Sequence, residues 1–215
     1  YTRTNWGGID AAMLKIQEII PLTIQGEGFH SGMPCSFIRL FGCPVGCHFC
    51  DTGYALGEKP PKFTLFLLEE ILDHIKSDNI VITGGEPCIN TEFTKLVVEL
   101  KNKEKNISVE TSGIKNLPIL SDVWVTLSPK EHISNNGRVD QEVFRNINEL
   151  KLIVSNPQDI KYYEDRIYWC NSKNIPVFFQ PEWNVRHDIL EVIIELADRY
   201  NAKVSNQIHK LIGVQ

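Results

Sequence analysis

The amino-acid sequence predicts an α/β protein built around a mostly parallel sheet, and two observations support this. From Met13 onward, short β-rich segments alternate with longer segments of helical periodicity, as repeated βα units do. Several β-rich segments, such as 152–154 and 177–179, are continuous apolar runs, which are typical of strands buried on both faces. A chain of 215 residues is within the range of one compact core, so we expect a single domain over residues 13–215.

The elements follow from this alternation. Strands are expected, in order, at 15–20, 36–41, 79–83, 107–110, 123–127, 150–154, 175–179 and 202–205. Helices are expected between them, at 65–76, 91–103, 157–172 and 187–200. The helix at 91–103 follows Asn90, a favourable N-cap, and carries apolar residues at helical spacing. Residues 1–12 are rich in Gly and Asn without an apolar period, and we interpret them as a tag remnant or a disordered N-terminal extension.

Composition excludes several classes of protein. The formal net charge of -5 provides no basic surface for wrapping a nucleic acid, so direct nucleic-acid binding is not expected. No apolar run is long enough to span a bilayer, and no charged leader precedes a short apolar segment, so we expect a cytoplasmic protein without a membrane partner. Six cysteines are too few for a secreted disulfide scaffold, and three of them lie within eight residues, which indicates metal binding.

These three cysteines are Cys43, Cys47 and Cys50, in a C-x3-C-x2-C segment that follows an expected strand. Thiolates suit iron–sulfur clusters and zinc. No fourth cysteine accompanies the segment, so a [4Fe-4S] cluster would keep one iron without a protein ligand, open to a small molecule. The alternatives are a structural zinc site with His48 as fourth ligand or a purely structural cluster, but His48 is adjacent to Cys47, an awkward geometry for joint coordination.

Three polar motifs each follow an expected strand directly, at 83–87, 110–113 and 128–130. The carboxyl ends of strands form the working rim of α/β barrels, so we expect these motifs to lie on one rim with the cysteines.

The cysteine segment, followed by Gly84-Gly85-Glu86 at a strand end, resembles the radical S-adenosylmethionine (SAM) superfamily. This resemblance implies a radical SAM core, a partial (incomplete) TIM-type barrel with a mostly parallel sheet. It also implies that the open iron chelates SAM and that one electron from the cluster cleaves SAM to a 5′-deoxyadenosyl radical.

Within that superfamily the chain resembles the 7-carboxy-7-deazaguanine synthases from Glu18 to the C-terminus. The matching motifs are 23–28, 37–39, 50–52, 83–87, 110–113, 128–130, 149–151, 180–181 and 207–210. The resemblance implies a lyase that contracts 6-carboxy-5,6,7,8-tetrahydropterin to 7-carboxy-7-deazaguanine with loss of ammonia, in queuosine and 7-deazapurine biosynthesis. It implies SAM and Mg²⁺ beside the cluster, an external one-electron reductant such as flavodoxin, and a homodimer.

The resemblance assigns roles to individual residues. SAM would contact Phe49, Cys50, Asp51, Gly85, Glu86, Ser128, Pro129, Lys130, Gln180, Pro181, Glu182 and Trp183. The pterin would contact Ile24, Gln25, Gly26, Arg39, Thr83, Glu110 and Gln215. Arg39 has a planar fork of donors suited to a carboxylate, and Glu110 can accept hydrogen bonds from the amino edge of a pterin. Thr52 would bind Mg²⁺ through its hard hydroxyl oxygen.

A reactive radical requires shielding from solvent, so we expect the segments 26–32 and 207–215 to cover the site. His209 and Lys210 in the second segment could equally end a strand at a dimer surface. Two further functions are weighed against the lyase: a glycyl-radical activating enzyme, which shares the cysteine spacing, and an iron–sulfur module without catalysis. The motifs at 24–28 and 207–210 argue against the activating enzyme.

Overall fold

The computed structural model describes residues 13–52, 62–116 and 122–214. Within these residues one nine-stranded sheet forms, in the order β3-β1-β2-β4-β5-β6-β7-β8-β9. Its strands, in chain order, are β1 (Met13–Ile24), β2 (Pro34–Leu40), β3 (Thr64–Leu67), β4 (Asn79–Gly84), β5 (Asn106–Thr111), β6 (Val123–Leu127), β7 (Glu149–Val154), β8 (Val177–Pro181) and β9 (Lys203–Val204). Each of the expected strands overlaps one of these.

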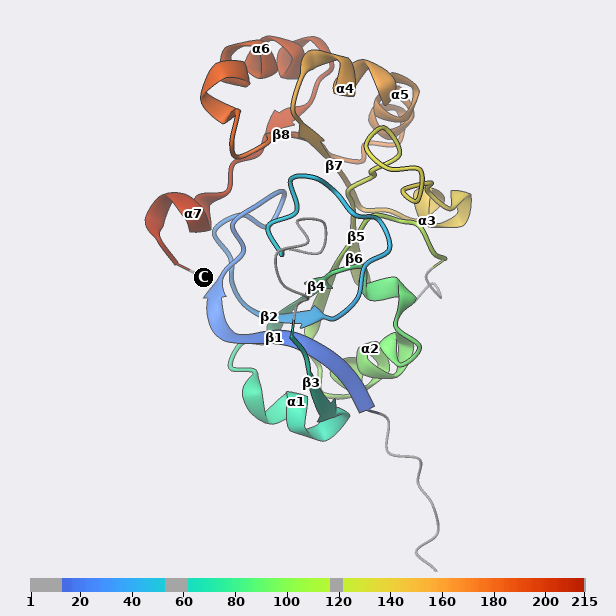
Figure 1. Ribbon diagram of the computed structural model, residues 1–215, viewed down its shortest axis with the longest axis vertical. Helices are drawn as coiled ribbons and strands as arrows, with labels where there is room; N and C mark the ends of the chain where they lie inside the picture. Colours follow the sequence, from blue (N-terminus) through green and yellow to red (C-terminus); the bar gives the residue numbers. More distant parts are fainter. Residues whose placement is uncertain (1–12, 53–61, 117–121, 215) are drawn as a thin grey trace, which may run out of the picture.

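The sheet is mostly parallel and open. Strands β2 and β4 to β9 run parallel to one another, whereas β1 is antiparallel to both of its neighbours, β2 and β3. The order of the strands places β3 at one edge and β9 at the other, so the curved sheet does not close on itself (Figure 1). The predicted fold, an incomplete α/β barrel, is confirmed.

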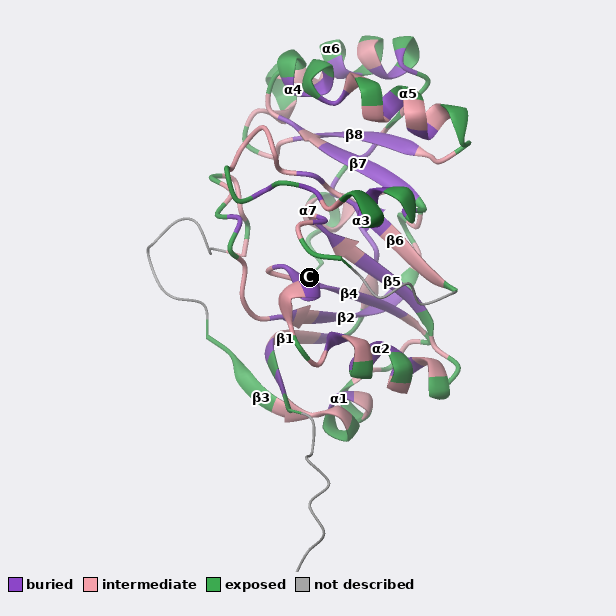
Figure 2. Cartoon of the chain, turned by 90° about the vertical axis from the view of Figure 1, so that its right-hand side faces the viewer, coloured by how far each residue is buried: buried purple, intermediate pink, exposed green. Residues whose placement is uncertain are grey.

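Helices cover the outer face of this curved sheet (Figure 1). They are α1 (Leu68–His74), α2 (Phe93–Asn102), α3 (Gln141–Arg145), α4 (Pro157–Tyr162), α5 (Glu164–Ser172) and α6 (Arg186–Arg199). A 3₁₀ turn at Pro87–Ile89 and a last helix, α7 (Ile208–Ile212), complete the elements of the described residues. Two apolar cores lie beneath them, one under α1 and α2 and the other under α3 to α6. In Figure 2 the strands β7 and β8 are almost continuously buried, as their apolar sequence predicts.

The structure corrects two of the expected helices. The segment 65–76 begins as strand β3, because Thr64 to Leu67 pair with Ile16 to Met13 of β1, and the helix starts only at Leu68. The expected helix at 157–172 is two helices that meet at Tyr163, whose ring is buried and whose hydroxyl lies 2.8 Å from the ring Nδ1 of His132. Tertiary contacts override local helical periodicity at both places.

Two short helices, α3 and α7, were not expected. Each has five residues, too few for an apolar period to be visible in the sequence. Helix α7 contains His209 and Lys210, so the alternative that these residues end a strand is wrong. In the described part of the chain, no helix combines the length and apolar character needed to cross a bilayer.

Candidate active site

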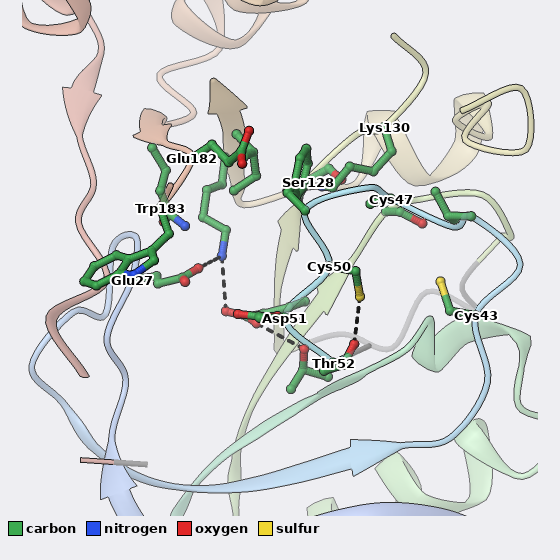
Figure 3. Close-up of a pocket in the computed structure, with 18 of the residues that line it drawn as sticks. Glu27, Cys43, Cys47, Cys50, Asp51, Thr52, Ser128, Lys130, Glu182 and Trp183 are labelled. Carbon is green, nitrogen blue, oxygen red and sulfur yellow. Dashed lines mark hydrogen bonds and ion pairs between the residues drawn. The ribbon is translucent and has the colours of Figure 1, made fainter. Parts of the chain in front are cut away.

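The three cysteines lie on the loop that follows β2 and line a cavity of about 220 Å³ at the carboxyl ends of the parallel strands. Figure 3 shows the side chains of Cys43 and Cys50 near each other on one side of this cavity. Gly42 and Gly46 have φ angles of 103° and 70°, which side-chain-bearing residues rarely adopt, and they allow the loop to turn tightly. The loop can therefore present its thiols to one space.

The Gly84-Gly85-Glu86 turn fastens the start of this loop. The backbone N–H of Gly85 donates to Leu40 O at 3.0 Å, and that of Glu86 donates to Gly42 O at 2.8 Å. A Cβ atom on Gly85 would lie 2.1 Å from Gly42 O, so no larger residue fits without moving the backbone. The second glycine of the motif is thus required for a close approach of two chain segments.

Residues 128–137 fasten the loop at a second place, Pro44 and Val45. The Ser134 hydroxyl donates to Val45 O at 2.5 Å, and the Asn136 amide donates to Pro44 O at 3.1 Å. Lys130 lies beneath, with its ammonium 2.5 Å from both Ser128 O and Ser128 Oγ. Burial lowers the pKa of Lys130 to about 8, partly offset by the nearby Cys47 thiol.

The thiols suit a cluster better than a single ion. Nowhere in 13–52, 62–116 or 122–214 do three His, Cys, Asp or Glu side chains converge on the position of one metal ion. A [4Fe-4S] cube takes its three thiolates on three separate irons and so accepts a wider spacing. Burial raises the pKa of the Cys43 and Cys47 thiols, so cluster binding would release protons.

Most of the residues expected to contact SAM line the same cavity. They are Phe49, Cys50, Asp51, Gly85, Ser128, Lys130, Gln180, Pro181, Glu182 and Trp183. They come from the ends of β2, β4, β6 and β8, as the strand-end motifs predicted. Two cations lie close to the Trp183 ring, the Arg186 guanidinium 3.8 Å and the Lys210 ammonium 5.1 Å from its centroid.

Two of the expected SAM contacts, Pro129 and Glu86, are not in the cavity lining. Glu86 is 1% exposed, and both of its oxygens accept hydrogen bonds from the chain itself. Its Oε1 accepts from Thr111 Oγ1 at 2.7 Å and from Cys88 N, and its Oε2 accepts from the Ser112 hydroxyl and N–H. In this arrangement the carboxylate ties the end of β4 to the end of β5.

A charged network forms the floor of the cavity. The Lys151 ammonium on β7 donates to Glu27 and lies 3.5 Å from Glu110 Oε1. Burial alone would lower the pKa of Lys151, but the carboxylates of Glu110 and Glu27 raise it well above its usual range. Burial acts on Glu27 in the opposite sense, yet Lys151 holds the pKa of Glu27 at about 2. Lys151 and Glu27 are therefore both charged at neutral pH.

The expected pterin contacts divide into two groups. Thr83 and Glu110 line the cavity, and Gln25 reaches it indirectly, because Gln25 Nε2 donates to Glu110 Oε1 at 3.1 Å. Ile24, Gly26 and Arg39 do not line the cavity. The Arg39 guanidinium pairs with Glu18 at 3.1 Å instead. Gln215 lies outside the described residues.

The hydroxyl of Thr52, the expected Mg²⁺ ligand, is in the cavity lining, 2.9 Å from Cys50 Sγ. Thr52 is the last described residue before the segment 53–61. Its position beside the cysteine loop is compatible with a metal site between cluster and substrate.

Helix α7 contacts the rim from the C-terminal side. Gln207 donates to Glu27 Oε1 at 2.8 Å, and the Lys210 ammonium lies 2.9 Å from Gln207 Oε1 and 3.3 Å from Asp51 Oδ2. A Cβ atom on Gly26 would lie 1.9 Å from the His209 ring, so the two expected covering segments contact each other. They do so at the edge of the cavity.

Sequence reasoning assigned no contact with SAM, substrate or metal to Glu27, Lys151, Gln207 and Lys210, which line the cavity. Each of these residues lies within a motif that matches the synthase family, at 23–28, 149–151 or 207–210, and this membership was the only sign of their function in the sequence. The motif alone does not say what the side chain contacts, since the ion pairs join residues 124 and 41 positions apart.

Comparison with known proteins gives consistent matches. The model of the radical SAM superfamily matches residues 37–129. The chain is 34% identical over 205 residues to the 7-carboxy-7-deazaguanine synthase of Flavobacterium psychrophilum, covering 92% of this chain and 93% of that protein. It is 29% identical over 213 residues to the synthase of Escherichia coli K12, covering 89% and 95%. A crystal structure of QueE from Escherichia coli superposes with a TM-score of 0.78 at 29% identity, over 91% of this chain and 94% of that one.

These relatives match nearly the whole chain, the solved structure shares its fold, and the cysteine loop, Gly-Gly turn and strand-end residues meet in one cavity. The chain belongs to the 7-carboxy-7-deazaguanine synthases, a family of radical SAM enzymes that use a [4Fe-4S] cluster and SAM.

Proposed function

We propose that this chain contracts the ring of 6-carboxy-5,6,7,8-tetrahydropterin to 7-carboxy-7-deazaguanine with loss of ammonia. The observation that carries the proposal is the joint lining of one cavity by three thiols and by the charged floor of Lys151, Glu110 and Glu27. The thiols suit a cluster that activates SAM, and the floor suits a polar heterocycle. The names of the relatives support the same reaction.

The cluster would be held by Cys43, Cys47 and Cys50. When both cofactors are bound, reductive cleavage of SAM at the cluster supplies the radical that the family uses. The Gly84–Gly85 turn offers backbone groups for the methionine end of SAM, and its close approach to the cysteine loop brings the two sites together. The segment 180–183 and the cations beside Trp183 would hold the remainder.

The pterin would rest on the floor of the cavity. Glu110 Oε2 accepts from Thr83 Oγ1 at 3.1 Å and its Oε1 accepts from Gln25, yet a carboxylate has four lone-pair positions and can accept further N–H donors. Its 20% exposed side chain therefore suits the amino edge of a pterin. Lys151, 3.5 Å from Glu110 Oε1, keeps this carboxylate oriented, so the ring would be held in one position while the radical reacts.

We also propose that Thr52 binds Mg²⁺, which would orient the substrate carboxylate and stabilise charge during rearrangement. Its hydroxyl lies in the cavity lining, and a hard cation that keeps several waters needs few protein ligands. Arg39 would reach the substrate only after exchanging its ion pair with Glu18.

An external reductant supplies electrons to a radical SAM enzyme, and we propose a flavodoxin-type carrier for this chain. We further propose a homodimer, for which the apolar side chains of Leu211, Ile212 and Val214, between 43% and 61% exposed on and beside α7, offer a contact surface. Six free thiols support a reducing compartment. Light scattering during size exclusion would measure the oligomeric state.

The test is anaerobic incubation of reconstituted protein with dithionite, SAM and the carboxytetrahydropterin. We expect the deazaguanine acid and ammonia, whereas absence of product from cluster-loaded protein would reject the reaction. Cys47→Ala should remove both cluster absorbance and turnover, and retained activity would contradict the cluster assignment. Formation of 5′-deoxyadenosine only in the presence of a protein partner would favour a glycyl-radical activating enzyme instead.

A further inference from the structure

Glu149 is a buried carboxylate below the floor of the cavity. It is 2% exposed on the inner face of β7, two residues before Lys151, and it is not in the cavity lining. Its Oε2 accepts from Phe29 N, Trp124 Nε1 and Thr126 Oγ1 at 3.2 to 3.3 Å. Its Oε1 is buried without a hydrogen-bond partner in the described chain, and burial raises the pKa of this carboxyl group. Such a group is costly to bury, so its retention needs a reason.

One of the three donors, Phe29 N, belongs to the segment that joins β1 to β2, and the other two lie on β6, so Glu149 links this segment to the sheet. Gly28 donates to Ser205 Oγ at 3.0 Å, and the ring of Phe29 stacks on that of Trp124 with centroids 4.7 Å apart. Gly28 has a φ angle of 64°, and a Cβ atom there would lie 2.1 Å from Glu149 Oε1. The segment is therefore held against β6, β7 and the end of β9 by contacts that admit only glycine at position 28.

The same segment carries groups that face the cavity. Gln25 donates to Glu110, and Glu27 pairs with Lys151 and accepts from Gln207. Hydrogen bonds from Gln25 N to Met33 O at 2.8 Å and from Gly32 N to Gln25 O at 2.7 Å close residues 25–33 into one compact loop. Fixing residues 28 and 29 consequently fixes the placement of Gln25 and Glu27.

We propose that Glu149 is a positioning residue for the pterin: it anchors the loop 25–33 from below, so that Gln25 and Glu27 meet Glu110 and Lys151 in the geometry that binds substrate. This inference rests on the proposed function. The cofactor side of the cavity shares none of the three hydrogen bonds to Glu149 Oε2. Loss of the contacts of Glu149 should therefore weaken binding of the pterin and leave binding of SAM unchanged.

The experiment compares Glu149→Leu with Glu149→Gln in cluster-loaded protein. An amide keeps an oxygen for the three donors, so we expect the KM for the pterin to rise by less than about threefold in Glu149→Gln and by at least about tenfold in Glu149→Leu. The KM for SAM and the cluster absorbance should stay within about twofold in both variants. Hydrogen exchange of peptides covering 25–33 should accelerate in Glu149→Leu alone.

Trp124→Phe provides a milder variant, because it removes one donor but keeps an aromatic ring against Phe29. We expect a rise of about threefold to tenfold in the KM for the pterin, which decides the matter if Glu149→Leu does not fold. Glu164→Gln is the matched control, since Glu164 is not in the cavity lining and its carboxylate accepts a hydrogen bond of 2.7 Å from the Tyr200 hydroxyl. The kinetics of this variant should equal those of the wild type.

An unchanged KM for the pterin in folded Glu149→Leu would overturn the proposal that Glu149 anchors the loop. Equal rises in the KM for SAM and the KM for the pterin would overturn it as well. Failure of the wild type to convert the pterin would instead reject the proposed function. The exchange measurement separates the two, because it reports on residues 25–33 without turnover.

Discussion

Replacing Lys151 by Met tests the charged floor of the cavity most directly. Lys151 is 4% exposed and is the cation between Glu27 and Glu110. The pKa of Glu27 falls from 4.5 to about 2. At about 1.4 kcal/mol for each tenfold change in proton affinity, this corresponds to about 3 kcal/mol. Removing one partner of a buried pair typically costs about 3–5 kcal/mol, so both arguments give a similar magnitude.

The pKa of Glu27 determines how the stability difference between Lys151→Met and the wild type should change with pH. Because the folded-state pKa of Glu27 lies below its ordinary value, its contribution to stability is complete above about pH 4.5 and is lost as the pH falls toward about 2. In Lys151→Met, burial without the ammonium should raise the pKa of Glu27 above 4.5. The variant can then take up a proton on mild acidification, so its stability deficit should narrow as the pH falls from about 7.5 toward about 5.

The assay is urea denaturation of wild type and variant across this pH range, with thermal unfolding as a second measurement. At neutral pH we expect a loss of about 3 kcal/mol, or about 6–12 °C in Tm for a chain of this size. Lys105→Met is the control, because Lys105 pairs with the 81% exposed Asp78 and should cost less than about 1 kcal/mol. Equal stability of Lys151→Met and wild type, or a deficit that does not change with pH, would refute the reasoning.

Three further predictions concern the surroundings of the cluster. Gly85→Ala should displace the backbone at Gly42 and cost about 1–3 kcal/mol, with iron content falling more than helix content does by circular dichroism. Ser134→Ala should lose the bond to Val45 O, destabilise by about 1 kcal/mol and speed cluster loss in air, and unchanged loss rates would contradict this fastening. Thr52→Val should abolish stimulation of turnover by Mg²⁺ while leaving SAM cleavage without substrate unchanged, and stimulation equal to the wild type would exclude Thr52 as ligand.

The sequence predicted the strands and the strand-end motifs because these are local signals. The apolar runs of β7 and β8 and the glycine turn after β4 are visible without knowledge of their neighbours. Strand β3 was hidden because its β conformation comes from pairing with residues 13–16, far away in the sequence. Long-range pairing of this kind leaves no periodicity to detect.

The candidate site divides in the same way. The thiols and most SAM-side residues were predictable because motif spacing and strand ends place them together. The partners of Lys151 and the hydrogen bonds of Glu86 within the chain were not predictable from the sequence. They depend on the alignment of segments that lie 25 or more residues apart. The sequence identified these residues as members of motifs, and the fold determined which contacts they make.

The loop that carries the thiols is held from both sides through its own carbonyl oxygens, at Leu40, Gly42, Pro44 and Val45. Carbonyl oxygens are common to every amino acid, so these attachments are indifferent to side-chain identity. Substitution of His48, whose side chain is 67% exposed and whose Nε2 lies 3.9 Å from Glu182 Oε2, would accordingly leave these attachments in place. The outward-facing side chains of the loop are thus free to vary while the backbone that presents the sulfur ligands keeps its geometry.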